Sequence, residues 1–461
     1  MLTRTITACT TLMLLGSPAA LSQTATAPPD FTTGLWTRGN LLGDGGGLRS
    51  TLWNYGITFG IQDINEVWGN VSGGIKRGAS YDGVTLASIG LDTQRAFGWN
   101  GGTFNISAWN IRGRSISSDN LLNLQTVSGI LATPTTRIWE VWYQQSFLDG
   151  QFDIKLGQQS LDQEFMVSAN SALFINTMMG WPMVPSADLY AGGPAYPLSS
   201  LGVRLRTQLP AGVTVLGGVF DDNPPGGPFD ADSQLLGSTR WGGNFNLRTG
   251  ALIIGEIQYA LNQPSNGQMD YGAGSSGLPG TYKLGFWADT APFPSPRFDN
   301  TGAPLALTGG TPLNLRNNFS VYGVADQVVW QPGGDDPRSV SVFARLMGAP
   351  GDRNLINFSV NAGITMKAPL PGRDDDTMGI GFGIAKVSPA AAGFDSDSGV
   401  PARGTESFIE ITYQAQVTGW WQVQPDFQYV FNPGGGILNP NDPTQRVGNE
   451  AIFGLRSVLT F

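Results

Sequence analysis

Residues 356–367 read INFSVNAGITMK, and in this stretch apolar and polar side chains alternate almost without exception. One face of the stretch carries Ile356, Phe358, Val360, Ala362, Ile364 and Met366. The opposite face carries Asn357, Ser359, Asn361, Thr365 and Lys367. Alternation with a period of two is typical of a β-strand that has one dry face and one wet face. The stretch therefore predicts such a strand.

The same alternation recurs from Gly56 to the end of the chain, in segments of about ten residues that turn clusters such as 331–337 and 369–374 separate. Aromatic residues often begin or end the apolar faces, as Tyr259 and Phe431 do. Aromatic residues at strand ends are typical of the girdles of membrane barrels, and a polar opposite face suits a lumen filled with water. We predict an all-β, transmembrane antiparallel β-barrel over residues 56–461, with 16 strands (18 possible) and long external loops.

The last strand carries a further signal of this architecture. Its apolar positions are Ala451, Phe453, Leu455, Leu459 and Phe461, so the alternation ends on a terminal aromatic residue. A final strand of this kind is what outer-membrane barrels present for assembly. We therefore expect outer-membrane lipid and lipopolysaccharide as surroundings, and the barrel-assembly machinery as a partner that recognises Phe461.

The N-terminus predicts export. Arg4 precedes a short apolar stretch, and Ala20-Leu21-Ser22 fits the rule of small residues before a signal-peptidase site. Residues 1–22 are thus predicted to be a signal peptide cleaved after Ser22, which places the chain in the outer membrane of a Gram-negative bacterium. Residues 23–55 form an N-terminal segment, where the helical spacing before Gly56 predicts a short periplasmic helix.

Composition excludes several function classes. Charged residues make up 13% of the chain, against roughly 25% in ordinary soluble domains. The chain has no His, and its one cysteine, Cys9, falls in the signal peptide, so His-based triads and thiol chemistry are excluded. The formal net charge of −9 disfavours nucleic acid as a partner. We expect a protein that is not an enzyme and has no catalytic residue, no metal and no cofactor.

The alternation also selects charged residues for the lumen. These candidates for lining the pore and binding substrate are Glu140, Lys155, Arg204, Arg206, Arg248, Glu256, Lys367, Glu410 and Arg456. Guanidinium donors and carboxylate acceptors can bridge the adjacent hydroxyls of a sugar. The alternative is an ordinary wall in which opposite charges satisfy each other.

Residues 160–197 lack clean alternation, and a loop of this length is uncommon unless it is functional or folded elsewhere. We predict that it folds into the barrel and narrows the pore. Trp181, within this loop, either stacks on a sugar face or packs the loop in place.

Three blocks resemble the carbohydrate-selective porin (OprB) family over nearly the whole mature chain. They begin at Leu42-Gly43-Asp44, at Gly180-Trp181-Pro182 and at Gln424-Pro425-Asp426, and the first has Gly45 where the family usually has Trp. The resemblance implies passive diffusion of small carbohydrates, such as glucose-like monosaccharides and polyols, through a 16-stranded barrel. A general or anion-leaning porin, and a secreted soluble carbohydrate-binding or hydrolysing β protein, remain the alternatives. Monomer and trimer are both compatible with the sequence.

Overall fold

The computed structural model describes residues 34–224, 241–243, 247–262, 277–333 and 336–461. The predicted signal peptide and its cleavage after Ser22 lie outside the described residues.

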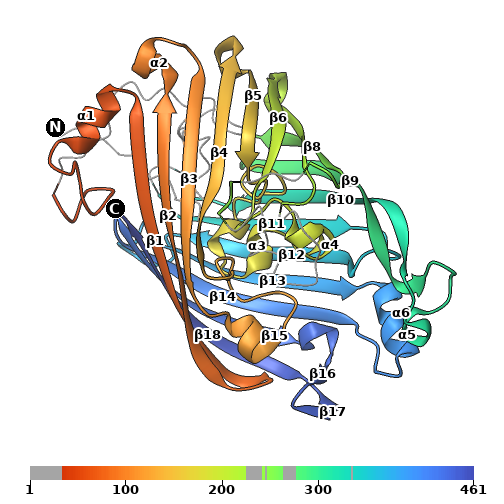
Figure 1. Cartoon of the computed structure of the whole chain (residues 1–461). Helices are drawn as coiled ribbons and strands as arrows, with labels where there is room; N and C mark the ends of the chain where they lie inside the picture. Colours follow the sequence, from red (N-terminus) through yellow and green to blue (C-terminus); the bar gives the residue numbers. More distant parts are fainter. Residues whose placement is uncertain (1–33, 225–240, 244–246, 263–276, 334–335) are drawn as a thin grey trace.

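Sixteen strands of the described chain close into one antiparallel barrel (Figure 1), which confirms the predicted fold and the lower of the two strand counts. The order around the barrel is β1-β18-β15-β14-β13-β12-β11-β10-β9-β8-β7-β6-β5-β4-β3-β2, so neighbours in the chain are neighbours in the wall. The barrel strands are β1 (Ile57–Gly74), β2 (Gly78–Asp92), β3 (Gly102–Gly113), β4 (Thr135–Phe147), β5 (Phe152–Gln159), β6 (Ser200–Leu209), β7 (Val213–Asp221), β8 (Ala251–Leu261), β9 (Gly280–Asp299), β10 (Pro312–Trp330), β11 (Ser339–Gly348), β12 (Ile356–Lys367), β13 (Thr377–Val387), β14 (Thr405–Thr418), β15 (Trp421–Phe431) and β18 (Gly448–Thr460). A separate hairpin is formed by β16 (Leu438–Asn439) and β17 (Asp442–Arg446).

Helices are short and lie in the connections or at the rim. They are α1 (Leu48–Asn54), α2 (Thr93–Phe97), η2 (Ser117–Leu121), η3 (Leu148–Gly150), η4 (Ser171–Leu173), α3 (Thr177–Gly180), α4 (Met183–Asp188), η5 (Tyr190–Gly192), η6 (Pro210–Gly212), α5 (Leu305–Thr308), α6 (Pro389–Asp397) and η8 (Pro433–Gly435). No helix in the described part of the chain is long and apolar enough to cross a membrane.

The barrel buries its polar face and exposes its apolar face. On β12, Phe358 and Ile364 point outward with 38% and 44% of their surface exposed, whereas Ser359 and Asn361 point inward and are buried. Tyr259, predicted for an aromatic girdle, is likewise exposed on the outside. A soluble protein has the opposite arrangement, with apolar side chains inside and polar side chains outside. A wall between lipid and an aqueous interior requires the arrangement seen here.

The two ends of the chain meet where the barrel closes. Residues of β1 and β18 pair from Gln62 with Thr460 to Asn70 with Ile452, and Phe461 N–H donates to the Ile61 carbonyl at 2.9 Å. Closure leaves no sheet edge unpaired, which matters because an unpaired backbone group in lipid costs several kcal/mol.

Helix α1 confirms the predicted helix before the first strand. It ends before Gly56, whose φ is +75°, and a Cβ there would lie 2.5 Å from the Asp92 carbonyl oxygen. Arg49 ties the helix to the rim by donating to the carbonyls of Phe59 at 3.0 Å and Phe461 at 2.5 Å.

The two ends of the barrel differ in their connections. At the end that holds α1 and the C-terminus, tight links such as η3, η6 and Gly419–Trp420 join the strands (Figure 1). At the other end, residues 114–134, 160–199 and 388–404 form long loops. Short turns face the periplasm and long loops face outward in transmembrane barrels, so α1 and the C-terminus lie on the periplasmic side.

Candidate functional site

The connection between β5 and β6, residues 160–199, lies inside the barrel and carries η4, α3, α4 and η5 (Figure 1). Its apolar side chains, among them Phe165, Met179 and Val184, are buried in one cluster with inward residues of the wall. The loop therefore folds inward, as its lack of alternation predicts.

Carboxylates from two distant strands hold this loop by accepting its backbone N–H groups. Glu256 of β8 accepts from Met166 at 2.8 Å. Glu410 of β14 accepts from Ile175 at 2.5 Å and from Asn176 at 3.2 Å. Because a buried N–H without a partner is costly, these carboxylates fix the loop's path across the lumen.

Asp326 of β10 holds the beginning of the same loop. Its Oδ1 accepts from the Ser168 hydroxyl at 2.7 Å and from the Asn170 side-chain amide at 2.9 Å. The Asn170 backbone N–H donates to the same oxygen at 3.1 Å. One wall residue thus fixes both Ser168 and Asn170, five strands along the wall from β5.

Arg345 of β11 also holds the loop, but as a cation that donates to the loop's carbonyl groups. Its guanidinium is 1% exposed and donates to four loop carbonyls: Met166 at 2.8 Å, Met178 at 2.5 Å, Met179 at 3.1 Å and Gly180 at 3.0 Å. Five fixed donors in a planar fork suit arginine, and not lysine, for gathering several carbonyls.

A second inward loop, residues 114–134 between β3 and β4, packs against the first. Gly129 N–H donates to the Ile175 carbonyl at 2.9 Å, and Thr177 N–H donates to the Thr126 carbonyl at 3.0 Å. Gln428 of β15 reaches the second loop through its side-chain amide, which donates to the Val127 carbonyl at 2.8 Å. The two loops therefore form one layer within the barrel.

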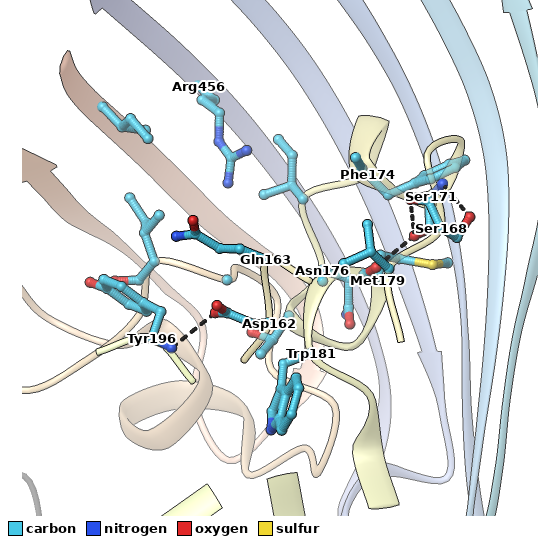
Figure 2. Close-up of a pocket in the computed structure, with 18 of the residues that line it drawn as sticks. Asp162, Gln163, Ser168, Ser171, Phe174, Asn176, Met179, Trp181, Tyr196 and Arg456 are labelled. Carbon is cyan, nitrogen blue, oxygen red and sulfur yellow. Dashed lines mark hydrogen bonds between the residues drawn. The ribbon is translucent and has the colours of Figure 1, made fainter. Parts of the chain in front are cut away.

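A cavity of about 130 Å³ lies between this layer and the wall formed by β18, β1 and β3 (Figure 2). Four aromatic side chains line it: Trp109, Phe174, Trp181 and Tyr196. The rings of Trp109 and Tyr196 meet edge to face with centroids 5.1 Å apart. The Trp181 indole N–H donates to the Gly192 carbonyl at 2.8 Å, so this ring is held in place within the loop.

Polar groups enter the same cavity beside the aromatic rings. Arg456, Asp162, Gln163 and Asn176 are among its lining residues, and Figure 2 shows the Arg456 guanidinium directed toward Gln163. Arg456 Nε pairs with Glu66 at 2.5 Å, while its buried Nη1 has no hydrogen-bond partner among the described residues. The cavity thus combines flat apolar faces with donors and acceptors.

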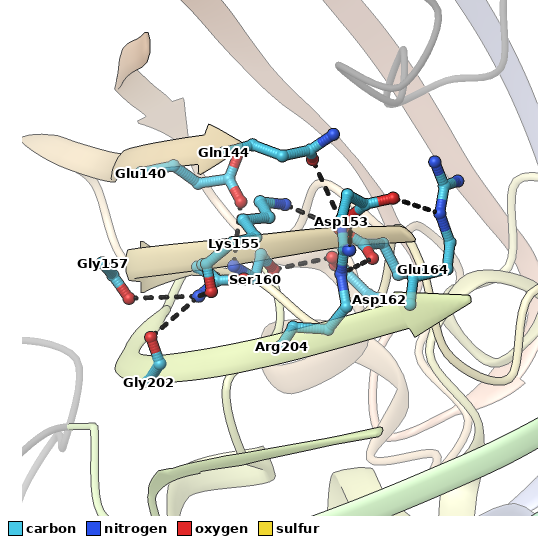
Figure 3. Close-up of polar contacts among 12 residues, drawn as sticks. Glu140, Gln144, Asp153, Lys155, Gly157, Ser160, Asp162, Glu164, Gly202 and Arg204 are labelled. Carbon is cyan, nitrogen blue, oxygen red and sulfur yellow. Dashed lines mark hydrogen bonds and ion pairs between the residues drawn. The ribbon is translucent and has the colours of Figure 1, made fainter. Parts of the chain in front are cut away.

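The predicted residues of β5 and β6 form a separate ion-pair network beneath the start of the long loop (Figure 3). Lys155 Nζ lies 2.7 Å from Glu164, and Arg204 Nε lies 2.6 Å from the other oxygen of Glu164. Asp153 pairs with Arg204 and, at 2.7 Å, with Arg206. Lys155 and Arg204 are 2% exposed, so these charges satisfy each other and the loop.

The charge of Glu164, which lies in the loop, follows from this network. Burial acts to raise the pKa of Glu164, but the two cations of Lys155 and Arg204 outweigh it and lower the pKa to about 2. Asp162, two residues earlier, accepts hydrogen bonds from Ser160 at 2.6 Å and from the Tyr196 N–H at 3.0 Å, and burial raises its pKa.

The remaining predicted residues divide between the loop supports and the rim. Glu140 is buried and accepts from Ser160 N–H at 2.9 Å, at the start of the long loop. Lys367 is half-buried at the periplasmic end of β12. Arg248 is exposed and lies in the connection before β8, where no strand imposes a face, so alternation does not apply to this residue.

Sequence reasoning missed Asp326 and Arg345, two of the strongest loop supports. Both occupy inward positions of alternating strands, and Arg345 lies between the outward residues Ala344 and Leu346 of its own strand. The alternation signal was available for both residues. It could not rank one inward charge above another, because the ranking depends on where the loop lands.

The comparisons with known proteins agree with this architecture. A model of the carbohydrate-selective porin, OprB family, matches residues 76–461. Porin B of Pseudomonas aeruginosa is 26% identical over 447 residues, which cover 91% of each protein. The putative porin QuiX of Acinetobacter baylyi is 22% identical over 481 residues and covers 97% of this chain and 98% of its own.

Solved structures show the same fold. The high-pH structure of Pseudomonas putida OprB is similar with a TM-score of 0.77 and 25% identity, and the match covers 93% of this chain and all of that one. The chain belongs to the OprB family of carbohydrate-selective porins and is a sugar porin of a Gram-negative outer membrane.

Proposed function

We propose that the cavity between the two inward loops and the wall of β18, β1 and β3 is the part of the channel that selects small sugars and polyols during passive diffusion. The observation that carries the proposal is the meeting of Trp109, Trp181 and Tyr196 with Arg456 and Asn176 in one cavity of the lumen.

This combination suits the chemistry of a sugar. A pyranose has apolar C–H faces and a rim of hydroxyls that both donate and accept hydrogen bonds. Aromatic rings cover the faces, while the free Nη1 of Arg456 addresses the hydroxyls. Diffusion also requires that binding be weak enough for release, and a few hydrogen bonds in a wet lumen satisfy this requirement.

We assign the other predicted residues to two roles within the same channel. Glu256, Glu410 and Glu140 hold the long loop by accepting its backbone donors. Lys155 and Arg204 line the wall below the loop and neutralise its Glu164, while Arg206 pairs with Asp153 of the wall. Passive passage needs none of them as a catalyst, so we propose a channel without enzymatic activity.

Liposome swelling tests the proposal. The full chain is reconstituted, and the swelling rate in glucose is compared with the rate in an amino acid of similar size. We expect glucose to pass faster, and we expect Trp181→Ala to reduce this preference because an aromatic face of the cavity is removed.

Trp330→Ala is the matched control, since Trp330 is exposed on the outer face at the periplasmic end of β10. Equal rates for glucose and the amino acid in the unmodified protein would reject sugar selection. An unchanged preference in Trp181→Ala would leave this ring with a packing role only.

A further inference from the structure

Glu450 is a buried carboxylate that nothing in the described structure satisfies. It is the third residue of β18, it points into the barrel, and none of its surface is exposed. Neither of its carboxylate oxygens has a hydrogen-bond partner among the described residues. Burial of an unpaired carboxylate costs several kcal/mol in practice, so such a group needs a proton or a cation.

Within the described part of the chain, the charged neighbour that acts on Glu450 is Glu406, which has the same sign. Glu406 is itself fully occupied: it accepts from the N–H groups of Leu124 at 2.7 Å, Gln125 at 2.7 Å and Gly434 at 2.6 Å. Glu450 is therefore the member of the pair that lacks a partner.

The β3–β4 loop runs from the end of β1 to β14, along the part of the wall that carries Glu450. The Asn120 carbonyl accepts from Ile75 N–H at 2.8 Å, just past the end of β1, and Leu124 and Gln125 reach Glu406 on β14. Strands β18 and β15 lie between β1 and β14 in the wall. Because Glu450 pairs with Val430 of β15, the segment between residues 120 and 125 spans the position of Glu450.

This segment brings amide oxygens that also lack partners. Asn123 Nδ2 donates to the Gln125 carbonyl at 2.9 Å, and Gln125 Nε2 donates to Glu406, which leaves Asn123 Oδ1 and Gln125 Oε1 buried and unpartnered. Asn70 Oδ1 is a third such oxygen, on β1 opposite Ile452 of β18. A carboxylate with several amide oxygens and no unsatisfied donor among them is the ligand set that hard divalent cations prefer.

We propose that Glu450, Asn123 and Gln125 form a binding site for a divalent cation of the calcium class, with Asn70 at its edge. The site joins the β3–β4 loop to the barrel wall, so the cation stabilises one side of the inward layer. No cluster of three acidic residues suited to a metal occurs among the described residues, and this site depends instead on one carboxylate and amide oxygens. The proposal is independent of how the channel selects its sugar.

Calcium binding by the purified full-length protein in detergent tests the site. After treatment with EDTA, the protein is titrated with CaCl₂ in a calorimeter, and the unfolding temperature is measured with and without calcium. We expect saturable binding and a higher unfolding temperature in calcium. Glu450→Gln is expected to weaken calcium binding by at least about tenfold, the lower bound for losing even a supporting group of a metal site.

Asp375→Asn is the matched control, because Asp375 is an exposed carboxylate in the periplasmic turn between β12 and β13. Asp375→Asn should keep both the calcium binding and the rise in unfolding temperature. Calcium bound by residual lipopolysaccharide would be the same in both variants, so a difference between them reports on Glu450. If the unmodified protein binds no calcium, or if Glu450→Gln binds as well as the unmodified protein, the site does not exist and Glu450 is a protonated acid.

Discussion

Substitution of Arg345 by methionine should open the channel without unfolding the barrel. The side chain is of similar length, so the change removes the donors with little loss of volume. Arg345 donates to four carbonyls of the 160–199 loop and, at 3.2 Å, to Asn361 of the neighbouring strand. The wall itself keeps its backbone pairing, since Arg345 contributes only its side chain to the loop.

The expected magnitude follows from these contacts. A hydrogen bond that involves a charged group contributes about 1.5–3 kcal/mol, and removal of one partner from a buried charged contact costs about 3–5 kcal/mol. The four bonds share one guanidinium and are not additive, and lumen water can solvate the freed carbonyls, so we expect about 3 kcal/mol. This free energy corresponds to a fall of about two orders of magnitude in the ratio of seated to displaced loop.

Single-channel conductance in planar bilayers measures this change. Arg345→Met should show a higher mean conductance with frequent transitions between levels, and faster passage of sugars too large for the unmodified channel. Circular dichroism and the heat-dependent shift in gel mobility establish that the barrel remains folded.

Arg338→Met serves as the control, because Arg338 is half exposed in the connection just before β11 and bonds only to Asp336 among the described residues. A folded Arg345→Met barrel with the conductance and size limit of the unmodified protein would refute the idea that Arg345 holds the constriction.

Two further predictions concern pH and side-chain orientation. The pKa of Glu164 is about 2, below its ordinary value of 4.5, so its ion pairs contribute their full stability above pH 4.5 and lose it as the pH falls toward 2. Conductance should stay constant from pH 7 to about 4.5 and change only below that range. Glu164→Gln should abolish this change in conductance at acidic pH. A change near pH 6 that is still present in Glu164→Gln would contradict the prediction. Side-chain orientation can be tested with single cysteines and a membrane-impermeant thiol reagent in intact membranes. Val203 is 42% exposed on the outside of the barrel, whereas Arg206 points inward. Arg206→Cys should react and Val203→Cys should be protected, and the reverse pattern would exclude the assigned faces.

The structure separates the predicted membrane barrel from one of its two alternatives, the soluble β protein. Alternation alone could not separate a membrane barrel from a soluble β protein, because both have strands with two different faces. The structure separates them through Phe358 and Ile364, which are exposed on the outside of a closed wall, while Ser359 and Asn361 are buried within it. The buried polar face requires a wet interior, and the exposed apolar face requires lipid.

Local sequence determined the features whose cause is local. The period of two fixes which side chains share a face of a strand. The sequence left 16 and 18 strands open, and the closed order of the wall in the structure sets the count at sixteen. Gly56 predicted the end of α1, because a helix often ends at a residue with positive φ and glycine adopts this conformation easily. This requirement concerns a single residue and is therefore visible in the local sequence. The lack of alternation in residues 160–197 predicted a loop that leaves the wall.

Only the tertiary structure decided which inward charges matter. Arg204 and Arg248 looked equivalent in the sequence, yet one is buried among carboxylates and the other is exposed before β8. Alternation is compatible with inward positions for Arg345 and Glu450, but it could not reveal their roles, because these depend on loops that arrive from more than a hundred residues away. The sequence therefore specifies the wall, whose pattern repeats every second residue, whereas the constriction depends on contacts that no local pattern encodes.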